Sequence, residues 1–183
     1  MGLKKKNSKM DAIAMLRGDH RKVEALFEAY EKGKGARKAA IAKEICQELS
    51  VHSTLEEELF YPALQGKIEE EDMLDEAHVE HDGAKVLIAE LMDGTPEEEF
   101  YDAKVKVLSE QIKHHVREEE RRGDGIFAQA GKTDVDMDEL GDRMQERKLD
   151  ILQEIKTRGL PRPTTRAMRG AKLNKGERVA AAE

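Results

Sequence analysis

Apolar residues recur three and four positions apart through most of the chain, which is the spacing of one face of an α-helix. Segments rich in glycine, proline and capping residues separate five such stretches. The pattern predicts helices over about residues 11–30, 37–65 and 69–92, from Pro96 to the break at Gly123, and over about 134–156. Short connections make successive helices antiparallel. The expected fold is therefore all-α: an antiparallel four-helix bundle with an additional C-terminal helix that covers an exposed seam.

Capping residues mark two of the helix starts. Ser8 followed by Asp11 resembles a capping box, and Thr95 is expected to be the N-cap of the fourth helix, with Pro96 in its first turn. From Arg158 onward glycine, proline and arginine dominate, so no regular structure is expected there. The chain then divides into a basic N-terminal tail (1–9), the bundle (10–130), the additional helix (131–157) and a flexible basic tail (158–183).

Histidine and glutamate interrupt the apolar stripes of the first four helices at matching depth. The six residues are His20, His52, Glu56, His81, His115 and Glu119. They form two similar sets: His20 precedes a His-x-x-x-Glu motif by 32 residues, and His81 precedes the second such motif by 34. The two halves of the bundle therefore repeat one candidate metal half-site.

This pattern points to metal because positions i and i+4 share one face of a helix. An unpaired charge in a core costs several kcal/mol, whereas a bound cation neutralises buried carboxylates. Imidazole and carboxylate ligands suit iron, manganese or zinc, and the single Cys46 argues against an iron–sulfur cluster. One zinc ion takes about four ligands, so six or seven converging groups favour two metals bridged by Glu56 and Glu119.

In these motifs the chain resembles the hemerythrin-like (HHE cation-binding) family over about residues 10–130. The acidic residues that follow Glu56 and Glu119 fit the resemblance as well. By this resemblance the four histidines of the two sets ligate two non-haem iron ions that carry an oxo or hydroxo bridge, and the two glutamates bridge the irons. Manganese or zinc is the alternative metal.

Two departures from the family's oxygen carriers weigh against oxygen carriage as the main role. The carriers have His-x-x-x-His on the third helix and an aspartate as the last carboxylate, whereas this chain has His78-x-x-His81 and Glu119. Three roles stay open for His78: a fifth ligand, a residue that hydrogen-bonds to the site, or a partly exposed residue. His114 is expected at the surface, and Tyr61 is not expected to be a ligand.

Charge and composition limit the partners and the location that the protein can have. The net charge of −7 combines basic ends with a body of −17 over residues 11–155, which favours cations over nucleic acid. Contact of the tails with nucleic acid or an acidic protein is the alternative to solvated tails. The acidic residues next to Glu56 and Glu119 are expected to be solvated. No apolar run approaches the roughly 20 residues of a membrane span, and no secretory signal is visible, so a cytoplasmic location is expected.

Three functions fit a di-iron bundle. The first is a protein that binds or senses O2, NO or peroxide in oxidative or nitrosative stress or in iron handling. The second is an enzyme that decomposes peroxide or reduces NO. The third is a regulatory or interaction module that metal stabilises. The first is preferred, and no nucleophile constellation, phosphate loop or substrate-sized polar motif points to a function outside these three.

Overall fold

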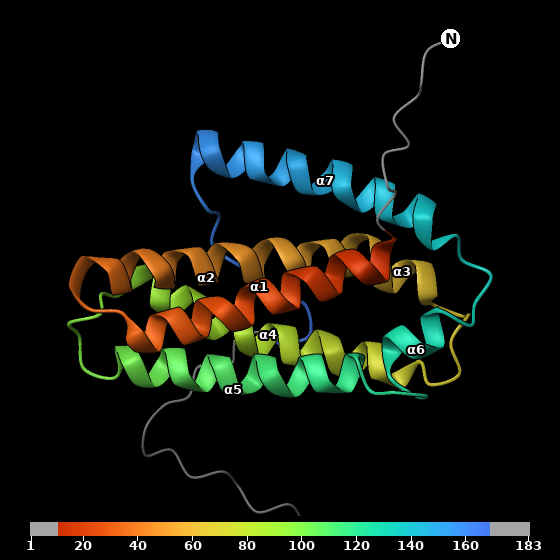
Figure 1. Cartoon of the computed structure of the whole chain (residues 1–183), viewed down its shortest axis with the longest axis horizontal. Helices are drawn as coiled ribbons and strands as arrows, with labels where there is room; N and C mark the ends of the chain where they lie inside the picture. Colours follow the sequence, from red (N-terminus) through yellow and green to blue (C-terminus); the bar gives the residue numbers. More distant parts are fainter. Residues whose placement is uncertain (1–10, 169–183) are drawn as a thin grey trace, which may run out of the picture.

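The computed structural model describes residues 11–168, and every regular element in this part of the chain is a helix. The elements are α1 (Ala12–Lys32), α2 (Gly35–Leu55), the π-helical turn η1 (Glu56–Phe60), α3 (Tyr61–Leu64), α4 (Asp72–Asp93), α5 (Tyr101–Glu119), α6 (Ile126–Ala130) and α7 (Met137–Arg158). Helices α1, α2, α4 and α5 pack as an antiparallel bundle, and α7 lies along α1 and α2 (Figure 1). The predicted fold class is confirmed.

The helix starts lie within about three residues of the sequence prediction, except at the fourth helix. Asp11 caps α1 by accepting a hydrogen bond from the Ala14 N–H, whereas Ser8 lies outside the described residues. The fourth helix begins at Tyr101, so Thr95 is not its N-cap. The Glu98 carboxylate does accept from the Thr95 N–H, but these residues form turns, and Phe100 has a φ of 69°. That left-handed residue separates the turns from the helix.

The π-helical turn η1 continues α2 at the second half of the first His-x-x-x-Glu motif. In it the Tyr61 N–H donates to the Glu56 carbonyl, a bond between residues five apart. The wider turn rotates the following residues, so that Tyr61 comes to lie on the buried side of the bundle with Glu56. An α-helical reading of this segment does not predict that position.

The apolar core consists of two clusters that the candidate metal residues separate along the bundle. One cluster contains Leu16, Leu55, Phe60, Phe127 and Met144, close to α3, α6 and α7. The other cluster contains Val23, Phe27, Ile45, Leu49, Ile88 and Leu108, towards the opposite end. Each buried large side chain contributes roughly 1.5–3 kcal/mol. The bundle therefore has two hydrophobic layers, and the polar residues lie between them.

The C-terminal segment covers the bundle from two sides. Helix α7, which the sequence predicted, packs on α1 and α2 through Leu140, Met144 and Ile151. Residues 159–168 contain no helix, as expected, but they contact the bundle: Arg162 pairs with Asp93, and the backbone N–H groups of residues 166–168 donate to Asp82. We call residues 159–168 the strap. The remainder of both predicted tails lies outside the described residues.

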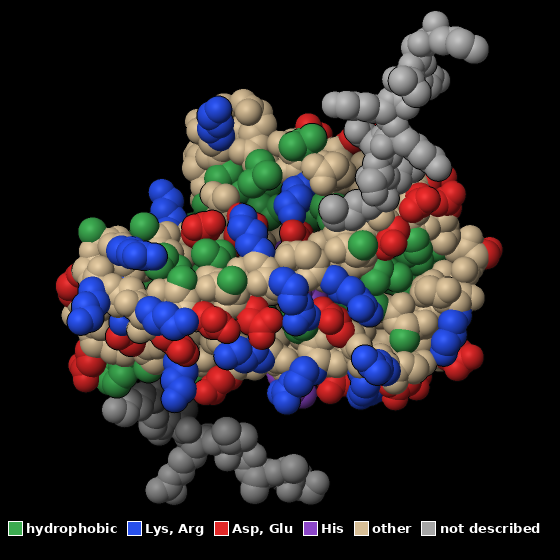
Figure 2. Space-filling view, viewed as in Figure 1, with side chains coloured by type: hydrophobic (Ala, Val, Ile, Leu, Met, Phe, Trp, Pro, Cys, Tyr) green, Lys and Arg blue, Asp and Glu red, His purple; other side chains and the backbone are tan. Residues whose placement is uncertain are grey.

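The surface mixes charges of both signs. Figure 2 shows lysine and arginine side chains interspersed with acidic ones over the face formed by α1 and α5. None of the helices in residues 11–168 combines the length and the apolar character that crossing a bilayer requires.

Candidate metal centre

The six residues of the two predicted half-sites meet in the middle of the bundle. The histidines approach in two pairs: the Nε2 atoms of His20 and His52 are 3.1 Å apart, and those of His81 and His115 are also 3.1 Å apart. All four rings are buried. Two ligand nitrogens about 2.1 Å from one metal ion and at right angles to each other lie about 3 Å apart. Each pair therefore has the spacing of two neighbouring ligands of one ion.

The two glutamates lie between the histidine pairs. Glu56 Oε2 is 3.1 Å from His52 Nε2 and 3.3 Å from His81 Nε2, so one carboxylate faces both pairs. Glu119 Oε2 lies 3.3 and 3.5 Å from the remaining histidine of each pair. Both glutamates are 0% exposed. Each glutamate therefore faces one histidine of each pair through its Oε2 atom.

The oxygen atoms of these glutamates fit a bound cation. Both carboxylate oxygens of Glu56 and Oε2 of Glu119 are buried without a hydrogen-bond partner among residues 11–168. A buried oxygen in that state is costly unless a cation or a donor reaches it. The ligand atoms of His20, His52, Glu56 and Glu119 lie within 4.8 Å of one another, as do those of Glu56, His81 and His115. The donor set thus contains two groups, sharing Glu56, that could each hold a metal ion.

Protons on His52 and His81 take the place of a cation in the metal-free arrangement. Burial by itself lowers the pKa of His52, but the Glu56 carboxylate and Asp19 outweigh burial and raise it to about 10. The same balance, with Glu56 and Glu57 as partners, raises the pKa of His81 to about 9. The pKa of Glu56 is lowered well below its usual range, because His52 and His81 outweigh its burial. A metal ion must therefore displace protons when it enters.

Four further carboxylates lie behind the histidines, on the side of their Nδ1 atoms. The distances from each Nδ1 atom are 2.8 Å for His20 to Glu120, 2.9 Å for His81 to Glu57, 2.7 Å for His115 to Glu80 and 3.8 Å for His52 to Asp19. Such partners fix the ring orientation and leave Nε2 free for a metal. Glu57 and Glu120 were expected to be solvated. They are instead partly buried, and the histidines lower their pKa values against the effect of burial.

The sequence contains the signal that identifies these four carboxylates. Asp19 and Glu80 directly precede the first histidine of each set, and Glu57 and Glu120 directly follow the candidate bridging glutamates. They belong to the same repeat as the six central residues. Only the packing of the helices shows which histidine each of them reaches.

His78 is not brought into this cluster. Its ring stands edge-on to Tyr61, and its Nε2 lies 3.4 Å from Arg166 of the strap. Burial and the charge of Arg166 lower its pKa. His114, expected at the surface, is exposed there and lies 3.4 Å from Glu80.

Tyr61 reaches the centre, in contrast to its neighbour His78. Its hydroxyl donates a hydrogen bond of 2.9 Å to Glu119 Oε1, and its ring stacks on His81. Burial, together with the negative charge of Glu119, raises its pKa well above the usual value, so the phenol keeps its proton. The sequence did not indicate this contact, because it depends on the π-helical turn.

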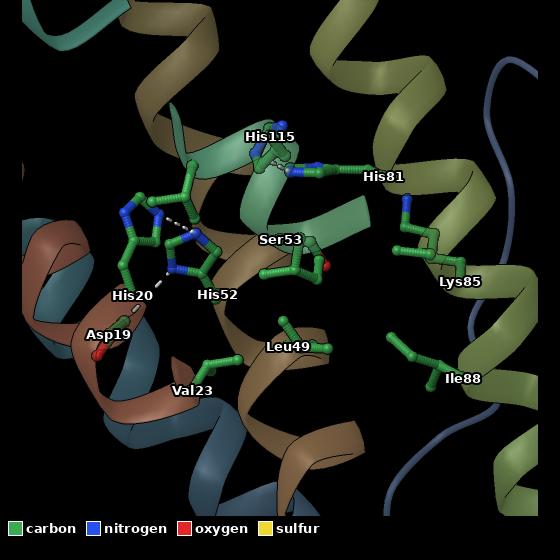
Figure 3. A pocket seen from close by; sticks show the side chains of 13 residues that line it. Asp19, His20, Val23, Leu49, His52, Ser53, His81, Lys85, Ile88 and His115 are labelled. Atoms are coloured by element: carbon green, nitrogen blue, oxygen red, sulfur yellow. Dashed lines mark hydrogen bonds and ion pairs between the residues drawn. The ribbon is translucent and has the colours of Figure 1, made fainter. Parts of the chain in front are cut away.

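A small cavity adjoins the four histidines. Figure 3 shows these side chains on one side and Val23, Leu49 and Ile88 on the other. The cavity has a volume of about 20 Å³, and its surface is almost entirely apolar. Its space matches one or two atoms the size of a water molecule.

Comparison with known proteins agrees with this geometry. The family model of the hemerythrin HHE cation-binding domain matches residues 11–122. The crystal structure of a hemerythrin HHE cation-binding domain-containing protein from Mycobacterium kansasii is similar, with a TM-score of 0.65, 22% identity and coverage of 82% of this chain and 94% of that one. A search of curated proteins found no match. Since the family model spans helices α1 to α5 and most of the chain, this protein belongs to the hemerythrin HHE cation-binding domain family.

Proposed function

We propose that the centre holds two non-haem iron ions and that the protein binds or senses a small ligand, O2, NO or peroxide, in oxidative or nitrosative stress or in iron handling. His20 and His52 would hold one ion, His81 and His115 the other, and Glu56 and Glu119 would bridge them. Iron at such a site supplies an open coordination position and a change between two oxidation states.

The cavity is the observation that carries the small-ligand part of this proposal. It lies against all four candidate ligand histidines, and its volume of about 20 Å³ has no room for an organic substrate. Apolar side chains such as Leu49, Ile88 and Ile112 form most of its other walls, and Asp19, Ser53 and Lys85 also line it. A neutral molecule of two or three atoms is the ligand that this space accepts.

Reconstitution with ferrous iron tests the proposal directly. We expect about two irons per chain after anaerobic loading and desalting, and a change in the optical spectrum when NO or O2 is added. A His114→Gln variant is the control, because His114 is an exposed histidine outside the cluster. Fewer than one iron per chain, with tight binding of zinc instead, would contradict the di-iron assignment.

Decomposition of peroxide is the second candidate, and Tyr61 is the observation that favours it. Breaking the bond between the peroxide oxygens requires protons at the centre. The Tyr61 hydroxyl donates its proton in a hydrogen bond to Glu119 Oε1. The other oxygen of the same carboxylate, Oε2, is the one that faces the histidines.

Replacement of Tyr61 by phenylalanine separates the two candidates. For an enzyme we expect oxygen evolution from peroxide to fall at least about tenfold in Tyr61→Phe, since a positioned proton donor contributes about 10² to 10⁴ in rate. Binding of NO and the iron content should stay unchanged. If the iron-loaded wild-type protein evolves oxygen no faster than free iron does, the enzymatic candidate is excluded.

A further inference from the structure

Of the four histidines, His52 lacks the hydrogen bond between Nδ1 and a carboxylate that the other three have. Carboxylates stand within 2.9 Å of the Nδ1 atoms of His20, His81 and His115. Asp19 Oδ2, by contrast, is 3.8 Å from His52 Nδ1, and that nitrogen is buried without a hydrogen-bond partner in the described part of the chain. Figure 3 shows Asp19 and His20 on the same side of His52, with Asp19 next to the ring nitrogen that points away from His20.

The two halves of the repeat differ here by one methylene group and one lysine. Glu80, the counterpart of Asp19 in the second half, has the longer side chain and reaches its histidine at 2.7 Å. Lys148 of α7 lies 2.5 and 2.7 Å from the two oxygens of Asp19 and draws the short carboxylate towards itself.

Elsewhere in the centre, a basic partner alone does not draw a carboxylate away from its histidine. Lys85 binds both oxygens of Glu57, which still lies 2.9 Å from its histidine. Arg21 binds Glu120 at 2.6 Å, and Glu120 also keeps its histidine at 2.8 Å. The combination of a short acid and a lysine from α7 is confined to His52 among these four positions.

We propose that Lys148 and Asp19 make the metal position of His20 and His52 the weaker of the two. This inference rests on the proposed two-metal site. A ligand histidine whose outer carboxylate lies beyond hydrogen-bond distance is less firmly oriented, and loss of such a partner lowers metal affinity about 10- to 100-fold. The ammonium group of Lys148 adds repulsion toward a cation on the same side. Helix α7 lies beyond the residues that the family model matches, so this chain's own C-terminal segment sets the difference.

Cadmium-113 NMR of the full-length protein can measure the two positions separately. With one equivalent of Cd²⁺, we expect the resonance coupled to the imidazoles of His81 and His115 to exceed the other by about tenfold or more. In Asp19→Glu the longer side chain reaches His52 while it stays paired with Lys148, and in Lys148→Gln the carboxylate is released. Both variants should reduce the excess at least about threefold, and Lys148→Arg should preserve it.

Arg147→Gln is the matched control. Arg147 is the neighbour of Lys148 on α7 and pairs with Glu58, which has no contact with a candidate ligand. Its replacement should leave the Cd²⁺ distribution unchanged. Asp19→Glu tests the inference even if Lys148→Gln destabilises the docking of α7.

Two results would overturn this inference alone, and a third would overturn the proposed metal site as well. Equal occupancy in the wild-type protein, or an unchanged ratio in Asp19→Glu, contradicts the role of Asp19 and Lys148. Absence of any bound Cd²⁺ resonance at two equivalents would contradict the proposed metal site itself, and this inference with it.

Discussion

Replacement of Glu56 by glutamine is expected to weaken divalent metal binding at least about 100-fold while the bundle stays folded. The amide keeps the volume of the side chain but removes the negative charge that faces both histidine pairs at 3.1 and 3.3 Å. Loss of an outer partner alone costs about 10- to 100-fold in affinity, so loss of a bridging ligand should cost more. The bundle should persist, because His52 and His81 can become neutral once the carboxylate is gone.

Competition with a chelator for Zn²⁺, together with thermal unfolding, measures this effect. The wild-type protein should gain thermal stability on adding metal, since a ligand that binds only the native state stabilises it. Glu56→Gln should lose most of that gain. Glu58→Gln is the control, because Glu58 is two residues away, exposed, and paired with Arg147. Similar affinities for Zn²⁺ in wild type and Glu56→Gln would exclude Glu56 as a ligand.

The metal-free protein is expected to lose stability as the pH rises from about 6.5 to 10. His52 and His81 have folded-state pKa values of about 10 and 9, both above the usual 6.5. Each protonated ring therefore stabilises the native state fully below pH 6.5, and this contribution disappears as the pH passes 9 and 10. The loss should be on the order of several kcal/mol, at about 1.4 kcal/mol for each unit of pKa.

Glu56 determines how the stability of the metal-free protein depends on pH in the acidic range. The pKa of Glu56 is lowered from 4.5, so its contribution is present above pH 4.5 and is lost as the pH falls through the lowered value. Stability of the metal-free protein should therefore be greatest between about pH 4.5 and 6.5.

Metal should abolish the alkaline loss, because the bound imidazoles have already given up their protons. Urea unfolding at several pH values, with chelator and with Zn²⁺, measures both profiles. A flat alkaline profile without metal would contradict the assignment of charged imidazoles to the buried cluster.

The sequence was sufficient to predict the four helices of the bundle, the additional C-terminal helix and the six residues that meet at its centre. His20 and His81 could be placed at one depth because each interrupts an apolar stripe, and the i, i+4 spacing placed Glu56 and Glu119 one turn beyond their histidines. Periodicity of this kind depends only on local geometry. It can therefore be recognised without knowledge of how the helices pack.

Contacts between helices could not be predicted in the same way. Nothing in the local pattern indicates that Glu57 reaches His81 on another helix, or that Lys148 reaches Asp19 across 129 residues. Tyr61 depends on a π-helical turn, which a regular helical pattern does not reveal. The start of α5 at Tyr101 depends on the left-handed Phe100, and a prediction based on Thr95 and Pro96 misses it.

The bundle consists of two helical hairpins, α1 with α2 and α4 with α5, and each hairpin supplies carboxylates to a histidine of the other. This arrangement bears on how such a site can arise. Glu56 and Glu57 of the first hairpin contact His81 of the second, while Glu119 and Glu120 of the second contact His20 of the first. One hairpin alone therefore has only one of the two candidate bridging glutamates. Two copies of one hairpin, related by a twofold axis, would supply the complete set. A symmetric dimer of half-length chains could thus bind both ions before any gene duplication and fusion joined them, after which positions such as Asp19 and Glu80 were free to diverge.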